Sequence, residues 1–213
     1  MTQAIKADRT ITREKYSEAK LQAQFLKASP DYLTAVPTNL STTLYTDNAN
    51  LAVTPVIGSD APTSFYVVRH NIYNSTEKTS YRLNIATSAG KLTVPQLGGK
   101  LTLDGRDSKV HVTDYNVGGT TLLYSTAEVF TWKKFDSGKV LILYGGPEEL
   151  HEASIVSKAK PTIIEGKGVT TKSIDGNVVL QWKTSASRRI VKIDDLSVYI
   201  LGKDPVLHVG SLN

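Results

Sequence analysis

The sequence of 213 residues contains no cysteine. Disulfide bonds, thiolate nucleophiles and cysteine-ligated metals are therefore excluded. Histidine is also scarce, and the four that are present are well separated along the chain. The pair His151-Glu152 does not begin a zinc-binding HExxH motif, because Ile155 stands where the second histidine is required. The sequence accordingly predicts no metal site and no cofactor.

Long apolar runs are absent as well. No segment approaches the ~18 apolar residues of a membrane-spanning helix, and the first ten residues lack the apolar core of a signal peptide. We therefore expect no membrane attachment and, for the chain as written, a cytoplasmic location. As a part of a longer secreted protein, the chain would be extracellular. Only in that case would the two sequons, at Asn39 and Asn74, be glycosylation sites.

Basic residues are not concentrated in one region, although the net charge is +5. Residues 1–27 hold six basic and three acidic side chains, and the remaining 19 basic and 17 acidic residues nearly cancel. A nucleic-acid interface needs clustered basic residues with interleaved aromatic ones. The distribution therefore predicts no nucleic-acid partner. A content of 40% hydrophobic and 21% charged residues is typical of a folded globular protein.

One amphipathic helix is predicted near the N-terminus. Thr12 can act as its N-cap, and Ser29-Pro30 ends it. Spacings of three and four residues place an apolar stripe on one face, and two larger side chains are expected to widen that stripe. The stripe consists of Tyr16, Ala19, Ala23 and Leu26, and the two additions are Leu21 and Phe25. The helix has to bury this stripe against the rest of the chain or against a domain outside it.

From about residue 42 onward, the sequence predicts short strands separated by turns. The predicted strands are Phe65–His70, Ser80–Asn84, Lys91–Val94, Lys100–Leu103, Lys109–Asp114, Thr121–Tyr124, Val129–Lys133, Lys139–Tyr144, Glu152–Val156, Thr162–Glu165, Val169–Ser173, Val178–Lys183, Arg189–Ile193 and Ser197–Leu201. Turns are predicted at Gly98-Gly99, at Asp136-Ser-Gly138 and at Asp175-Gly176.

These elements indicate an all-β fold of many-stranded antiparallel sheets with one N-terminal helix. About seven short strands from residue 140 onward predict a C-terminal immunoglobulin-like sandwich. A parallel sheet is not expected, because strands do not alternate with helices. We expect three parts: a helical lead-in over residues 1–30, an antiparallel β-hairpin subdomain over 31–139 and an immunoglobulin-like subdomain over 140–213.

No complete catalytic site is predicted. Glycoside hydrolysis needs two carboxylates on opposite sides of one bond, and no glutamate stands in a context that marks a catalytic strand end. The candidates are Glu128, Glu148, Glu149, Glu152 and Glu165. We interpret the loop over residues 145–152, which holds three of them, as a solvated acidic turn. His111 and Asp114 are expected on opposite faces of one strand and cannot form a local triad.

Aromatic side chains offer one possible binding function, since aromatic faces complement the C–H faces of sugars. Trp132 and Trp182 are the candidates for sugar stacking. Both lie in predicted strands among apolar neighbours, and the competing interpretation is that they are half-buried sheet residues.

Several blocks of sequence together resemble the fungal-type family-35 β-galactosidases. The blocks are Thr12–Glu18, Lys20–Leu26, Ser64–His70, Pro95–Gly99, Leu103–Lys109, Tyr124–Lys134, Val140–Pro147 and Arg188–Ile190. The resemblance runs from about residue 4 to about residue 201. It implies that the helix corresponds to the end of the catalytic (β/α)8 barrel. The remainder then corresponds to the all-β second domain that follows the barrel.

The resemblance also implies where the chemistry lies. In that family the acid/base and the nucleophile are two glutamates on barrel strands, and no residue here matches those motifs. The chain departs from the family in the loop over residues 145–152 and after Leu201, where the usual continuation is replaced. The sequence is then either a piece of a longer enzyme or a short relative without its other domains.

We therefore expect a non-catalytic accessory domain of a β-galactosidase. Its implied partners are the catalytic barrel and the other β-domains of the same enzyme. The alternative is an independent module that binds galactose-containing glycans through the two tryptophans. A third possibility, catalysis by this chain alone, would require a carboxylate pair that the sequence does not reveal.

Overall fold

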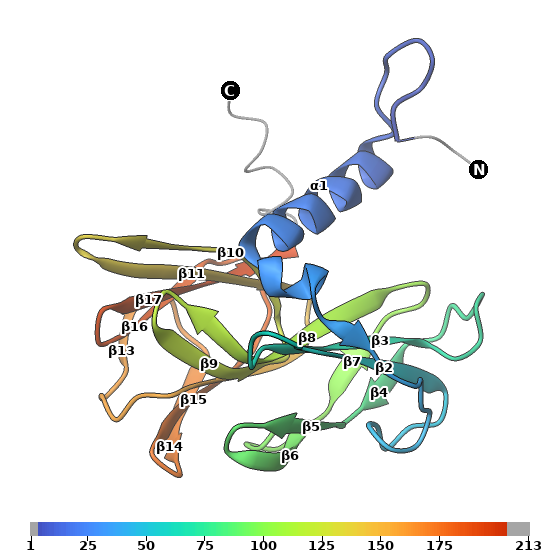
Figure 1. The fold of residues 1–213 in the computed structure, drawn as a ribbon. Helices are drawn as coiled ribbons and strands as arrows, with labels where there is room; N and C mark the ends of the chain where they lie inside the picture. The colour runs from blue at the N-terminus through green and yellow to red at the C-terminus, as the bar shows by residue number, and fades with distance from the viewer. Residues whose placement is uncertain (1–3, 204–213) are drawn as a thin grey trace.

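The computed structural model describes residues 4–203 and is built mostly of β-strands (Figure 1). The largest sheet has eight antiparallel strands in the spatial order β1 (Val36–Pro37), β2 (Leu51–Ile57), β3 (Ser64–His70), β8 (Ser108–Val117), β9 (Thr120–Ser125), β12 (Leu150–Ile155), β15 (Asn177–Lys183) and β14 (Val169–Ile174). A five-stranded sheet has the order β10 (Glu128–Phe135), β11 (Gly138–Gly145), β17 (Leu196–Gly202), β16 (Arg189–Ile193) and β13 (Thr162–Glu165).

Two small sheets complete the β-structure. β4 (Thr79–Tyr81) pairs with β7 (Leu101–Leu103), and β5 (Leu83–Thr87) pairs with β6 (Gly90–Val94). The turn predicted at Gly98-Gly99 therefore does not join a hairpin, because β6 and β7 pair with other strands. The strand predicted over 80–84 is divided in two at Arg82. The expected all-β fold with one N-terminal helix is confirmed.

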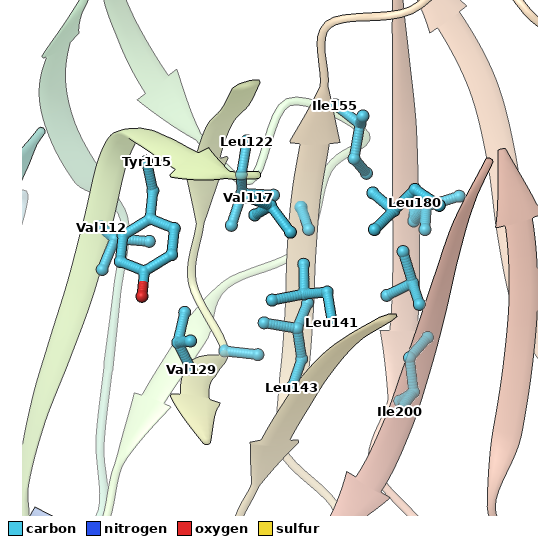
Figure 2. Close-up of a cluster of buried hydrophobic side chains, with 14 of the residues drawn as sticks. Val112, Tyr115, Val117, Leu122, Val129, Leu141, Leu143, Ile155, Leu180 and Ile200 are labelled. Atoms are coloured by element: carbon cyan, nitrogen blue, oxygen red, sulfur yellow. The ribbon is translucent and has the colours of Figure 1, made fainter. Parts of the chain in front are cut away.

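The eight-stranded sheet is the central layer of three. One face packs on the five-stranded sheet through a large apolar core. Figure 2 shows side chains of β8, β9, β12 and β15 converging with those of β10, β11 and β17, including Val112, Leu122, Leu141, Leu180 and Ile200. The other face packs on the two small sheets through a second core that contains Tyr66, Tyr81 and Leu83.

One strand pair departs from the antiparallel expectation. β11 and β17 run parallel from Lys139–Leu196 to Gly145–Gly202, because the chain between them crosses to the central sheet and returns. The hairpin predicted at Asp136-Ser-Gly138 is confirmed, with Phe135 paired to Gly138. The Asp175-Gly176 turn is confirmed as well, and both of its residues have positive φ, as a type I′ turn requires.

Strands β11 to β17 are divided between the two large sheets that pack on each other. Both sheets, however, continue into strands from the earlier part of the chain, and the boundary between residues 139 and 140 lies inside β11. The division into subdomains stays a prediction.

Helix α1 (Arg13–Ala28) ends at the predicted position and is followed by the 3-10 helix η1 (Pro30–Leu33). Its C-terminal part packs beside β10, and its first turns project away from the sheets (Figure 1). No helix within residues 4–203 has the length and apolar character needed to cross a bilayer.

Candidate functional site at the α1 junction

Helix α1 packs on the β-sheets through the side chains of Leu21 and Phe25. Leu21 is 5% exposed and contacts Tyr144 in a small cluster on the outer face of the five-stranded sheet. Phe25 meets Tyr32 and Phe65 edge-on, with ring centroids 5.5 and 5.9 Å away. Edge-to-face ring pairs at this distance are favourable beyond the area they bury.

The C-terminal end of α1 is held by hydrogen bonds from two aromatic side chains of the β-sheets. The Ala28 carbonyl accepts hydrogen bonds from the Tyr115 hydroxyl (2.7 Å) and from Trp132 Nε1 (3.0 Å). The Tyr115 hydroxyl also lies 2.8 Å from Ser29 Oγ. The last carbonyls of a helix have no partner within the helix. These donors therefore fix the last turn of α1 to β8 and β10.

A cavity of about 290 Å³ lies between α1 and the strands β8, β10 and β11. We call it the α1 cavity. Its walls combine apolar groups with several ionisable ones. The lining residues are Glu18, Leu21, Gln22, Phe25, Leu26, Tyr32, Asp107, Ser108, Val110, Glu128, Tyr144 and Lys203.

The carboxyl group of Glu128, which lines this cavity, has a perturbed pKa. Burial raises its pKa to about 7, and Asp107 contributes in the same direction against the opposing effects of Lys109 and Lys203. Burial likewise raises the pKa of the Tyr144 hydroxyl, which is hydrogen-bonded to Glu128. A perturbed acid in a cavity is a common mark of a functional position.

The cations beside Glu128 are already paired. Lys203 forms an ion pair of 2.7 Å with Glu18 of α1. Lys109, which is 3% exposed, lies 2.9 Å from Glu149 and 3.5 Å from Asp107. Asp107, Lys109 and Glu149 therefore form a chain of ionic groups that leads from the cavity into the core, separate from the Glu18–Lys203 pair at α1.

Glu149 forms the inner end of this chain. Its carboxylate accepts hydrogen bonds from Lys109 Nζ, from the Gly146 N–H and from His151 Nε2. Burial of Glu149 opposes ionisation. The hydrogen bond with His151 and the attraction of Lys109 outweigh that cost and lower its pKa to about 2.

His111 lies in the same buried region and is uncharged near neutral pH. Its Nδ1 donates to the Thr126 carbonyl, and its Nε2 accepts from the Tyr81 hydroxyl, both at 2.8 Å. Burial and the nearby Lys109 lower its pKa to about 3. Asp114 has a positive φ of 48°, which interrupts the alternation of β8, and it accepts hydrogen bonds from the backbone and hydroxyl of Ser88. Both side chains therefore point to the small-sheet side of β8, so the prediction of opposite faces is wrong, although the two have different partners and do not pair.

Comparison with known proteins shows the family of the chain. Residues 34–206 match the family model described as beta-galactosidase, domain 2. The chain belongs to this family. It is 59% identical over 198 residues to the probable beta-galactosidase A of Aspergillus flavus, which covers 92% of the chain and 20% of that relative. The beta-galactosidase A of Aspergillus niger is 55% identical over 203 residues, covering 94% of the chain and 20% of the relative.

A third relative, the beta-galactosidase A of a Penicillium species, is 52% identical over 204 residues, again covering 94% of the chain and 20% of the relative. The chain thus spans about a fifth of the length of the curated relatives it matches. The resemblance to fungal β-galactosidases is confirmed, and the match is to one domain of a larger enzyme.

Two carboxylates of this domain correct the interpretation of the loop over residues 145–152. Only Glu148 is solvated, whereas Glu149 and Glu152 are 1% and 0% exposed. Glu152 accepts hydrogen bonds from the Gln96 and Leu97 backbone, the Tyr124 hydroxyl and the Gln181 amide, which satisfy both oxygens. Sequence spacing could not reveal these partners, because they come from segments far apart in the chain.

The two predicted sugar-stacking residues lie in different environments. Trp182 is 2% exposed and packs in the main core beside His151, so it has no free face for a sugar. The prediction for Trp182 is therefore wrong. Trp132 is half-buried, donates to Ala28 and lines a shallow groove with Phe135 beside α1.

The sequons and the remaining glutamate have simpler positions. Asn39 and Asn74 are both exposed, as glycosylation would require. Glu165 is on the surface in a two-point ion pair with Arg188. Within residues 4–203, no group of three metal-binding side chains is positioned to hold an ion.

The side chains of the α1 cavity were not recognised from the sequence as a group. Glu128 was a candidate only as a carboxylate, and Asp107 and Lys203 carried no signal. What brings them together is the packing of α1 over β8 and β10. The sequence signal that was available is a Glu between the apolar residues Ala127 and Val129, immediately before a predicted strand.

Proposed function

We propose that this chain is the non-catalytic second domain of a β-galactosidase and that it supports the catalytic (β/α)8 barrel. The observation that carries the proposal is the distribution of side chains around α1. Leu21 and Phe25 pack on the β-sheets, whereas the stripe of Tyr16, Ala19 and Ala23 lies on the opposite side of the helix.

This outward stripe is poorly covered within the chain. Ala19 and Ala23 are exposed, and Leu26, which lies between the stripe and the α1 cavity, has 36% of its surface accessible. A helix that is apolar on two opposite sides is suited to lie between two bodies. The β-domain described here is one body, and we propose that the barrel is the other.

The enclosed carboxylates support a non-catalytic role. A glycosidase pair has to reach the sugar from both sides of its bond. Glu149 and Glu152 are buried with their oxygens occupied, and Glu128 borders a cavity beneath α1. Hydrolysis of β-galactosyl bonds would then belong to the barrel, and as part of such a secreted enzyme the domain would be extracellular.

A chimeric enzyme tests the support of the barrel. Residues 4–203 would replace the matching segment of the Aspergillus niger relative, and hydrolysis of a chromogenic galactoside would be measured. We expect the chimera to be active and the isolated chain to be inactive. Ala23→Glu should lower the thermal stability and activity of the chimera, because it places a charge in the proposed interface.

The matched control is Ala186→Glu, which changes an exposed alanine on the loop after β15. It should leave the chimera unchanged. Equal effects of the two substitutions would argue against the interface. Activity of the isolated chain that a single Glu→Gln change abolishes would overturn the non-catalytic role.

A further inference from the structure

We propose that the α1 cavity is a pH-sensitive junction: α1 stays packed on the β-sheets while Glu128 is protonated and loosens when Glu128 ionises. All groups of this junction belong to this chain, so the inference does not depend on what covers the outward side of α1. It rests on the cavity, on the paired state of its cations and on the attachment of α1 at one end.

The groups that face Glu128 come from every element around the cavity. Helix α1 contributes Glu18, β11 contributes Tyr144, and the residue after β17 is Lys203. Asp107 lies in the loop just before β8, and Lys109 lies near the start of β8. Apolar walls are supplied by Leu21, Phe25 and Val110.

Ionised Glu128 keeps the hydrogen bonds from the Tyr144 hydroxyl and the Val110 N–H but has no cation of its own. Lys203 is engaged with Glu18, and Lys109 is engaged with Glu149 and Asp107. A further negative charge in a half-buried site is costly unless it is paired or hydrated. Burial accordingly raises the pKa of Glu128 to about 7.

Hydration of the ionised group is possible if α1 moves outward. The last turn of α1 is fixed through the Ala28 carbonyl, whereas the part that covers the cavity is held by Leu21 and by the Glu18–Lys203 pair. We therefore expect α1 to move away from the β-sheets around Glu18 and Leu21, with Ala28 as the pivot.

The direction of the pH effect follows from proton linkage. In the open form Glu128 is hydrated and titrates near its ordinary value of 4.5, whereas in the closed form it titrates near 7. Between these values the open form binds fewer protons, so the closed form loses stability as the pH rises from about 4.5 to 7. Below 4.5 no loss is expected, and above 7 the loss is complete.

Hydrogen exchange of the α1 backbone measures this opening. Protection factors for peptides within residues 16–24, corrected for the intrinsic exchange rate, would be compared at pH 4.5 and pH 7.5 in the 213-residue chain. We expect protection to fall at least tenfold in the wild type. A smaller fall would overturn the proposal.

Three variants make the measurement specific. Glu128→Gln should remove the fall, and Glu165→Gln, which changes an exposed paired glutamate, should retain it. Tyr144→Phe removes a hydrogen bond that favours ionised Glu128 and should move the midpoint to higher pH. If Glu128→Gln does not fold, the shift of the midpoint in Tyr144→Phe tests whether Glu128 is the titrating group. A fall that persists in Glu128→Gln, disappears in Glu165→Gln or keeps its midpoint in Tyr144→Phe contradicts the junction.

Discussion

At the scale of single residues, two neighbouring glutamates in the loop between β11 and β12 have opposite environments. Glu148 is exposed, has a positive φ of 60° and forms a surface ion pair with Lys183. Glu149 turns inward and binds Lys109 and His151. The backbone conformation of a loop decides which side chain points inward. Two adjacent glutamates in the sequence do not indicate which of them will be buried.

Glu149→Gln tests the energetic weight of the buried pair. The substitution leaves the Lys109 ammonium buried without its main counter-ion, and breaking such a pair typically costs about 3–5 kcal/mol. We expect a loss of that order in urea unfolding at pH 7, measured by the fluorescence of Trp132 and the buried Trp182. Glu148→Gln, one residue away, should leave the unfolding midpoint unchanged. Equal losses for both would show that Glu149 is not the buried partner.

At the scale of elements, α1 shows how far periodicity could predict the structure. The spacing of apolar residues predicted the helix and its end at Ser29. It could not decide which stripe packs on the sheets, because Leu21 and Phe25 lie nearly opposite Ala19 and Ala23. The expectation that Leu21 and Phe25 widen the same stripe was wrong.

For the strands too, local sequence patterns predicted the positions of elements but not their packing. Alternating and β-branched segments such as Phe65–His70 and Thr162–Glu165 were located to within a residue. β2 was missed because Pro55 interrupts it, and Pro normally argues against an inner strand. The pairing of β7 with β4, and the α1 cavity, depend on contacts between distant segments that no local pattern encodes.

Two glycines at hairpin turns should differ in their tolerance of alanine. Gly176 has φ +77°, and a Cβ added there meets no neighbouring atom, so Gly176→Ala should cost about 1 kcal/mol of backbone strain. Gly138 has φ +138°, and its Cβ would lie 2.5 Å from the Asp195 carbonyl oxygen. Gly138→Ala should therefore lower the thermal midpoint distinctly more. The reverse order would contradict this account of the β10–β11 turn.

At the scale of the whole molecule, the central sheet belongs to both apolar cores. β3 directs Phe65 into the core with the five-stranded sheet and Tyr66 into the core with the small sheets. β9 does the same with Leu122 and Leu123. One core cannot be lost without removing the support of the strands that form the other.

Unfolding should consequently be a single transition, even though two β-subdomains were expected. Leu141→Ala in one core and Leu83→Ala in the other should each cost about 2–5 kcal/mol and lower the same calorimetric peak. Equality of the calorimetric and van't Hoff enthalpies would support one cooperative unit. Two separate peaks, each shifted by only one substitution, would instead favour independent subdomains.

The hydrogen bonds from Tyr115 and Trp132 to the Ala28 carbonyl fix α1 at its C-terminal end, so a rotation of the helix is centred there. The helix has 16 residues and is therefore roughly 24 Å long, with its fixed point at one end. A tilt of about 5° around Ala28 would displace the first turn by roughly 2 Å, whereas the last turn would hardly move. A small shift of α1 where Glu18 contacts Lys203 and Leu21 contacts Tyr144 is thus magnified at the end of the helix that projects farthest from the sheets.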